Sequence, residues 1–183
     1  MTDNYYINQT NFKNALIKFY GKCIFSDTKD LKQCVEVCII PNNILGNKNN
    51  KVTILYNGLL MRKDVKISFE SFAFSIIPEP IEIRLIDSKL WTMVSCIADG
   101  DLSIINGKKI CILYSSLFFV KWHYHRYLEI RSYKSSENIF SLDFFCVTTN
   151  SDKYLNETIK QIKYINNECA YDSDKDIVML PVD

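Results

Sequence analysis

The strongest constraint on the fold is a period of two among the apolar residues, which runs with interruptions from residue 34 to residue 150. Successive side chains of a strand point to opposite faces of a sheet, so this alternation predicts strands with one buried face. The clearest segments are "CVEVCII", "KVTILYN", "DVKISFESFAF", "IEIRLI" and "WTMVSCI". Asp99-Gly100 and Asn106-Gly107 are the two strongest hairpin signals. The pattern predicts about seven or eight strands in antiparallel sheets.

The segment 10–21 departs from this period. Four of its apolar residues have helical spacing: Phe12, Ala15, Leu16 and Phe19. Thr10 could cap such a helix and Gly21 could end it. The segment is also rich in strand-forming residues, so it equally fits the opening strand of a sheet. The sequence leaves both structures open.

The segment 151–166 also departs from the period of two. Its apolar positions recur every three or four residues, behind a serine and an aspartate that can cap a helix: Leu155, Thr158, Ile159, Ile162 and Ile165. This spacing predicts a C-terminal helix. The remaining residues, 167–183, form a tail that is acidic in its first half.

Length and composition indicate one cytoplasmic domain. A chain of 183 residues with 22 basic and 21 acidic side chains has a net charge of +1, which gives no overall attraction to nucleic acid or to a membrane. We see no secretory signal and no run of roughly 18 apolar residues. The seven cysteines lie mostly in strand-like runs, as expected of buried thiols in a reducing cytosol. We expect the sheets of this domain to extend over about residues 15–150.

Both histidines lie in one segment, "KWHYHRYLEIRSY". A period of two places His123 and His125 side by side on the more polar face of a strand. Two such residues can chelate a metal, but a catalytic zinc site needs three protein ligands. The chain has no third histidine and no Cys-x-x-Cys pair. We therefore predict two solvated histidines, and neither a metal nor another cofactor.

Sequence motifs for catalysis are absent. The chain has five glycines, no glycine-rich phosphate loop and no Gly-x-Ser-x-Gly elbow. A Cys–His nucleophile pair stays open, because its members meet only in space. We expect a protein that binds a partner and catalyses no reaction.

The order of the strand segments carries a family resemblance. The segment "IEIRLIDSKLWTMVSCI" contains a strand, an acidic turn and an aromatic strand, and "NGKKICILYS" supplies the next hairpin and strand. The segment "HYHRYL" then follows at residues 123–128. In this order, the segments resemble the poxvirus host-range family of vaccinia virus and its leporipoxvirus paralogues. The resemblance covers about residues 20–135.

This resemblance implies a fold and a function. The fold is an antiparallel β-sandwich flanked by one or two short helices, without catalysis. Family members bind and disable an interferon-induced host restriction factor that has a sterile-alpha-motif domain, which permits viral replication. For this chain we therefore expect an immune-evasion role in the host-cell cytoplasm, with a host protein as partner. We expect a monomer that binds neither nucleic acid nor a membrane.

The resemblance also implies a binding site. Family members use loops that carry a lysine, a tryptophan and a phenylalanine; the matching segments here are "SDTKDLKQC", "LLMRKDV" and "DSKLW". The first lacks the glycines and the aromatic residue of the family, and the second lacks the tryptophan. The partner-binding residues implied are Lys29, Asp30, Met61, Arg62, Leu90 and Trp91. A tryptophan that opens a strand is also typical of a core position.

A second class of function stays open. Strands followed by an amphipathic helix are also the outline of a pleckstrin-homology-like barrel, which would bind a phosphoinositide or a peptide. The segment "ILYNGLLMRK" is loosely similar to the opening strand of that fold. Arg62, Lys63 and Lys66 could contact phosphate there, although Asp64 interrupts them. A helix that only covers a sheet edge fits the sequence equally well.

Overall fold

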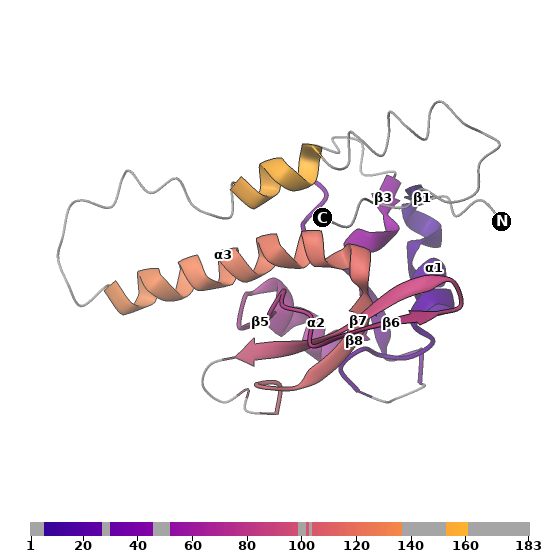
Figure 1. Ribbon diagram of the computed structural model, residues 1–183, viewed down its shortest axis with the longest axis horizontal. Coiled ribbons are helices and arrows are strands. Elements are labelled where there is room, and N and C mark those ends of the chain that lie inside the picture. Colours follow the sequence, from indigo (N-terminus) through magenta and orange to yellow (C-terminus); the bar gives the residue numbers. More distant parts are fainter. Residues whose placement is uncertain are drawn as a thin grey trace.

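The computed structural model describes residues 6–26, 30–45, 52–98, 102, 104–136 and 153–160 (Figure 1). Several predicted features lie outside these residues: Lys29, the Asp99-Gly100 turn signal, Cys146, Cys169, the flanks of the predicted C-terminal helix and the acidic tail. The structural statements that follow concern the described residues.

Helices separate three groups of strands along the chain. The strands are β1 (Tyr6–Asn8), β2 (Cys34–Cys38), β3 (Val52–Ile54), β4 (Gly58–Arg62), β5 (Phe74–Ile76), β6 (Glu82–Ile86), β7 (Lys89–Ala98) and β8 (Lys109–Leu113). The last of these groups runs from β5 to β8. The α-helices are α1 (Gln9–Tyr20), α2 (Lys63–Glu70), α3 (Leu117–Ser136) and a short helix at residues 153–160. Two single 3-10 turns, Leu55–Asn57 and Tyr114–Ser116, lead into β4 and α3.

All strand pairs are antiparallel. Strand β1 pairs with β3 and β2 pairs with β4, while β7 is the central strand of a third sheet. Strand β8 lies along one edge of β7, and β5 and β6 follow each other along the opposite edge. The stretch between β5 and β6 contains Pro78 and Pro80, which have no N–H group and so cannot donate to β7. This local interruption is what the two prolines predict.

One hydrophobic core joins the sheets to the helices. It contains Phe12 and Leu16 of α1, Leu60 of β4, Val94 of β7 and Val120 of α3, all nearly inaccessible to solvent. Helix α3 lies across the sheet in Figure 1, and the side chains of α3 and β5 are hydrogen-bonded. The prediction of antiparallel sheets with flanking helices is therefore confirmed at this level.

The prediction of a strand in the histidine segment is wrong, because residues 117–136 form α3. The segment is rich in aromatic and β-branched residues, which favour strands. Apolar and polar side chains are also spread almost evenly around the helix, so no clear helical stripe marks the sequence. Its buried residues nevertheless have helical spacing, with Val120, His123 and Tyr127 on one face.

The strand predicted at "DVKISFESFAF" is also wrong for its first half, which forms α2. In a helix Val65 and Phe69 are one turn apart and share a face, and Phe69 is fully buried. Ile67 is 63% exposed, so its alternation with those two residues does not reflect a buried sheet face. Only Phe74–Ile76, at the end of the segment, forms a strand.

For residues 9–20 the sequence left a helix and a strand open, and the structure has a helix; Gly21 follows it with a φ of 65°, a conformation that favours glycine. Two other sequence predictions are confirmed. The Asn106-Gly107 signal lies between β7 and β8: Gly107 has a φ of 73°, and its N–H donates to the carbonyl of Cys96. The helix at 153–160 lies within the predicted span 151–166.

Candidate functional site

Asp30 and Arg62 lie at the same end of the β2–β4 pair. Arg62 ends β4 and is opposite Cys34, whose thiol donates to the carbonyl of Asp30 over 3.6 Å. The carboxylate of Asp30 accepts from the backbone N–H of Lys32 and from the side chain of Gln33, which orders the preceding turn. The structure thus brings together two of the residues that the resemblance implies, and both keep solvent-exposed side chains.

The guanidinium of Arg62 already has an acidic partner. It donates to both carboxylate oxygens of Asp64, at 3.0 and 2.6 Å. These bonds help to hold the pKa of Asp64 below its usual range, although partial desolvation opposes them. A ligand that binds Arg62 through a carboxylate or a phosphate must therefore compete with Asp64.

Met61 does not belong to an exposed site. Its side chain has no accessible surface, because it points from β4 into the hydrophobic core. The implied role of Met61 in partner binding therefore needs correction. The position that matches the tryptophan of the family's binding loop lies on a strand here, and its side chain points inward. It therefore cannot contact a partner as an exposed loop residue would.

Leu90 and Trp91 are the second and third residues of β7 and point to opposite faces of the hairpin formed by β6 and β7. The Trp91 ring is half-buried and contacts Tyr20 of α1 edge-on, with 5.7 Å between the ring centroids. Beside it, the ammonium group of Lys89 lies 5.0 Å from the centre of the Phe19 ring. Trp91 therefore joins the hairpin to α1, whereas Leu90 is 42% exposed.

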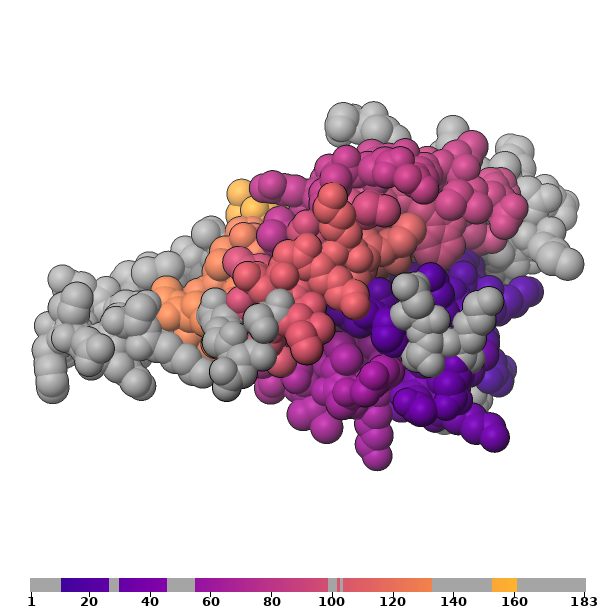
Figure 2. Space-filling view, turned by 90° about the horizontal axis from the view of Figure 1, so that it is seen from below, coloured from indigo at the N-terminus to yellow at the C-terminus, as the bar shows by residue number. Residues whose placement is uncertain are grey.

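An apolar surface on the hairpin was not predicted as a site. Ile83 pairs with Thr92 and Leu85 with Leu90, so these side chains share one face of the sheet. Thr92 is buried, but Ile83, Leu85 and Leu90 are 50%, 70% and 42% exposed. The sheet face that is buried at Thr92 therefore extends past the hydrophobic core and is exposed toward the turn of the hairpin. We call Ile83, Leu85 and Leu90 the hairpin face; the segment lies at the outer rim in Figure 2.

The sequence carried a signal for this surface. "IEIRLI" alternates, which predicts a strand with one buried face. All five residues of β6 are nevertheless exposed. The alternation alone could not distinguish a face that covers the core from a face that projects past it.

The two histidines have different environments, and neither lies on a strand. His123 is buried: its Nδ1 is 2.8 Å from the hydroxyl of Ser75, and its Nε2 is 3.1 Å from the carbonyl of Phe69. Because a carbonyl only accepts, Nε2 carries the proton and Nδ1 accepts from Ser75. The imidazole is stacked 3.7 Å from the Phe69 ring. Burial lowers the pKa of His123 to about 3, so the ring is neutral at pH 7.

This Ser–His pair has the wrong geometry for catalysis. Ser75 and His123 are both nearly inaccessible to solvent, so a substrate cannot approach the serine oxygen. The serine donates to a histidine whose other nitrogen bonds a backbone carbonyl, which is a closed structural network. Burial also raises the pKa of Cys38 to about 11 and that of Cys96 to about 12, which keeps both thiols protonated.

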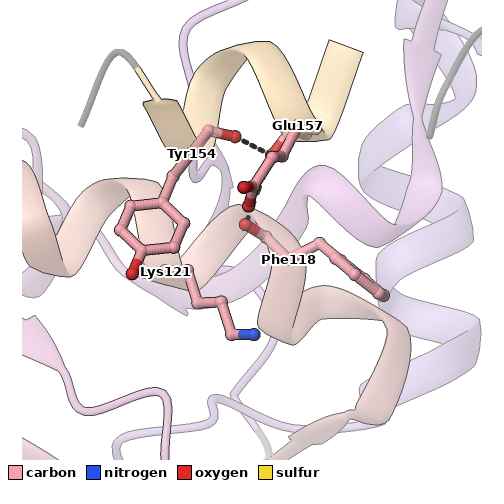
Figure 3. Close-up of a pocket in the computed structure, with 5 residues that line it drawn as sticks. Phe118, Lys121, Tyr154 and Glu157 are labelled. Carbon is pink, nitrogen blue, oxygen red and sulfur yellow. Dashed lines mark hydrogen bonds between the residues drawn. The ribbon is translucent and has the colours of Figure 1, made fainter. Parts of the chain in front are cut away.

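A small cavity separates α3 from the helix at 153–160 (Figure 3). Its volume is about 120 Å³, and its lining is Phe118, Lys121, Tyr154, Glu157 and Thr158. Ligand pockets typically exceed about 300 Å³. Among the described residues, no group of three or more His, Cys, Asp or Glu residues is placed to hold a metal ion. The cavity therefore has the size of a packing gap between two helices.

The chain was compared with known proteins by sequence and by structure. No protein-family model, curated protein or solved structure matches it. In the described part of the chain, none of the helices has the length and apolar character needed to cross a membrane.

Proposed function

We propose that the chain is a non-enzymatic binding protein of the poxvirus host-range type. In this proposal it acts in the cytoplasm of the host cell, where it binds an interferon-induced antiviral factor with a sterile-alpha-motif domain. The observation that carries the proposal is the end of the β6–β7 hairpin, where apolar side chains are exposed around the turn. The "DSKLW" segment, which resembles a partner-binding loop of the family, forms this turn and the start of β7.

The chemistry of the exposed residues supports protein binding. Leu90 offers apolar surface next to Ile83 and Leu85, and exposed apolar patches with polar surroundings are typical of protein interfaces. Asp30 and Arg62 supply exposed charges at one end of the β2–β4 pair. Charges at the rim of an interface mainly steer association and select the partner.

The proposal includes the β-sandwich of the family. The β2–β4 pair and the β7 sheet contribute buried side chains to the same core, among them Leu60 and Val94. Such shared packing is expected when two sheets lie face to face. An experimentally determined structure would test this arrangement by the angle between the strands of the two sheets.

The first test is a pull-down of the tagged protein from interferon-treated mammalian cells, analysed by mass spectrometry. We expect recovery of the sterile-alpha-motif factor and its loss with Leu90→Asp, because a carboxylate on an apolar interface loses its hydration. Ile104→Asp is the matched control: Ile104 is 84% exposed in the β7–β8 connection, away from the hairpin turn. Recovery of the factor should be unchanged with this variant.

Two results would contradict the proposal. One is the absence of the factor from the recovered proteins while other host proteins are enriched. The other is equal recovery with Leu90→Asp and with the wild-type chain, which would remove the hairpin face from the interface. Lys29→Glu extends the same experiment to the first of the implied loops; Lys29 itself lies outside the described residues.

The geometry supports the pleckstrin-homology-like alternative less than it supports the host-range proposal. Lys63 and Lys66 lie in α2, so they do not form the strand-connecting loop that would hold a phosphate. Arg62 is paired with Asp64, and Lys66 lies 3.6 Å from the carboxylate of Glu70. Binding to phosphoinositide vesicles that weakens with added salt would favour this alternative.

A further inference from the structure

The outer edge of β6 has the geometry of an unused pairing site. In the described part of the chain, β6 pairs with β7 alone. Ile86 and Lys89 flank the two-residue turn and form the closing pair of the hairpin, so they exchange backbone hydrogen bonds. Hydrogen bonding alternates along the strand, so the N–H and C=O groups of Ile83 and Leu85 point away from β7.

Strand β6 lacks two of the residue types that commonly protect an edge. It contains no proline and no lysine, and all five of its side chains are exposed. Its two charged residues, Glu82 and Arg84, lie on the face opposite Ile83 and bond to each other at 2.6 and 2.8 Å. An exposed edge strand with apolar side chains tends to pair with another strand.

We propose that a second copy of this chain pairs with β6, antiparallel to it and related by a two-fold axis at Ile83. The spacing of the charges selects this register. Glu82 then lies opposite Arg84 of the second copy, and the symmetry repeats the pair. Moving the axis by one residue would place Arg84 opposite its own copy, which like charges disfavour. The outward N–H and C=O of Ile83 bond their equivalents in the second copy.

The same register continues the hairpin face across the axis. Ile83 lies opposite its own copy at the axis, and Leu85 lies on the same face of each β6 strand; these side chains are 50% and 70% exposed in the single chain. Two exposed apolar surfaces therefore become one surface with less contact to water, which stabilises the assembly. This dimer differs from the monomer that we expect from the sequence. It shares Ile83 and Leu85 with the surface proposed for the host partner, but its test requires no host protein.

Charge reversal tests both the dimer and its register. Sedimentation of the purified wild-type chain over a range of concentrations should show a monomer–dimer equilibrium. In the dimer of the Arg84→Glu variant, both of the 82–84 pairs between the copies consist of two carboxylates. In the dimer of the Glu82→Arg variant, both pairs consist of two guanidinium groups. We expect each single variant to dimerise at least about tenfold more weakly than the wild type. Both residues are exposed, so neither change should disturb folding.

Two further samples make the test specific. An equimolar mixture of the Arg84→Glu and Glu82→Arg chains restores opposite charges at both paired positions, so the mixture should associate more tightly than either chain alone. The double variant Glu82→Arg/Arg84→Glu should dimerise like the wild type. A wild-type chain that stays monomeric, or single variants that dimerise as tightly as the wild type, would overturn the proposal. If the mixture associates no more tightly than its separate components, the proposed register is wrong.

Discussion

At the scale of single residues, the two histidines show how strongly position decides chemistry. They are two residues apart on α3, yet His123 is 2% exposed between aromatic rings while His125 lies nearer the surface. The rings of Phe69 and Phe72 both stack on His123, at 3.7 and 4.6 Å between centroids. A neutral imidazole fits this place because it satisfies Ser75 and the Phe69 carbonyl while presenting an aromatic face.

His123 should make the stability of the protein depend on pH. Its pKa is about 3 in the folded chain against an ordinary value of 6.5, so below pH 6.5 only the unfolded chain takes up its proton. Its contribution to stability is therefore complete above pH 6.5 and is lost as the pH falls toward 3. Between pH 7 and pH 5 this loss amounts to about 2 kcal/mol. Urea unfolding across this range measures it.

The variant His123→Phe isolates this effect. It should remove most of the pH dependence, while lowering the free energy of unfolding at pH 8 by about 1–3 kcal/mol because Ser75 and the Phe69 carbonyl lose their partner. His125→Gln is the control and should keep the larger share of the pH dependence. An unchanged slope with His123→Phe would show that another group is responsible.

At the scale of elements, the sequence predicts those whose local signals agree with their tertiary environment. Strand β6 and the start of β7 have alternation on both sides of a turn, and they are found where predicted. Helix α3 conflicts with its local signals, because its aromatic residues favour strands and its polar residues lie all around it. Helix α3 is stabilised by tertiary packing, against the sheet on one side and the helix at 153–160 on the other, and the periodicity of a single sequence does not contain that information.

The residues of the candidate site also divide into those that the sequence predicts and those that depend on the assembled fold. The resemblance places Leu90 on the exposed hairpin turn, and the alternation of "IEIRLI" gives the face to which Ile83 and Leu85 point. The burial of Met61 could not be predicted from a loop alignment, because it depends on the strand that "LLMR" forms with β2. That β6 projects beyond the core is a property of the assembled sheet, and no local pattern encodes it.

The turn between β6 and β7 contains strained residues. Asp87 and Ser88 have φ values of 49° and 59°, as a two-residue turn of type I′ requires at both central positions. Glycine adopts such angles without steric conflict, so Ser88→Gly should raise the free energy of unfolding by about 0.5–1 kcal/mol. Thermal unfolding should show this as an increase of about 2–4 °C per kcal/mol for a chain of this size.

Ser88→Ala is the informative comparison for this prediction. It removes the hydrogen bond from the Ser88 hydroxyl to the carbonyl of Asp87 but keeps a Cβ atom at a positive φ, so it should not stabilise the chain. If both variants have the same melting temperature, the strain at Ser88 does not contribute to the stability of the hairpin. A lower melting temperature for Ser88→Gly would contradict the prediction directly.

At the scale of the whole molecule, a helix distant in sequence covers the outer side of α3. The helix at 153–160 runs beside α3 in Figure 1, and Tyr154 stacks on His125 with 4.2 Å between ring centroids. The hydroxyl of Thr158, buried at this contact, lies 3.5 Å from the carbonyl of Phe118. A helix of this length is marginal by itself in water, so its packing against α3 is what stabilises it.

This packing can be measured at His125. The pKa of its imidazole lies below its usual range, chiefly because burial disfavours the charged ring, with Lys121 adding to the effect and Glu129 opposing it. Tyr154→Ala removes the stacked ring, so water should reach the imidazole and the pKa of His125 should rise. An NMR titration resolves the two histidines of the chain, and His123 should remain neutral throughout. Asn156→Ala, at an exposed position of the same helix, should leave the His125 pKa unchanged. If Tyr154→Ala also leaves it unchanged, the helix is not packed against α3 in solution, and its stability must come from other contacts.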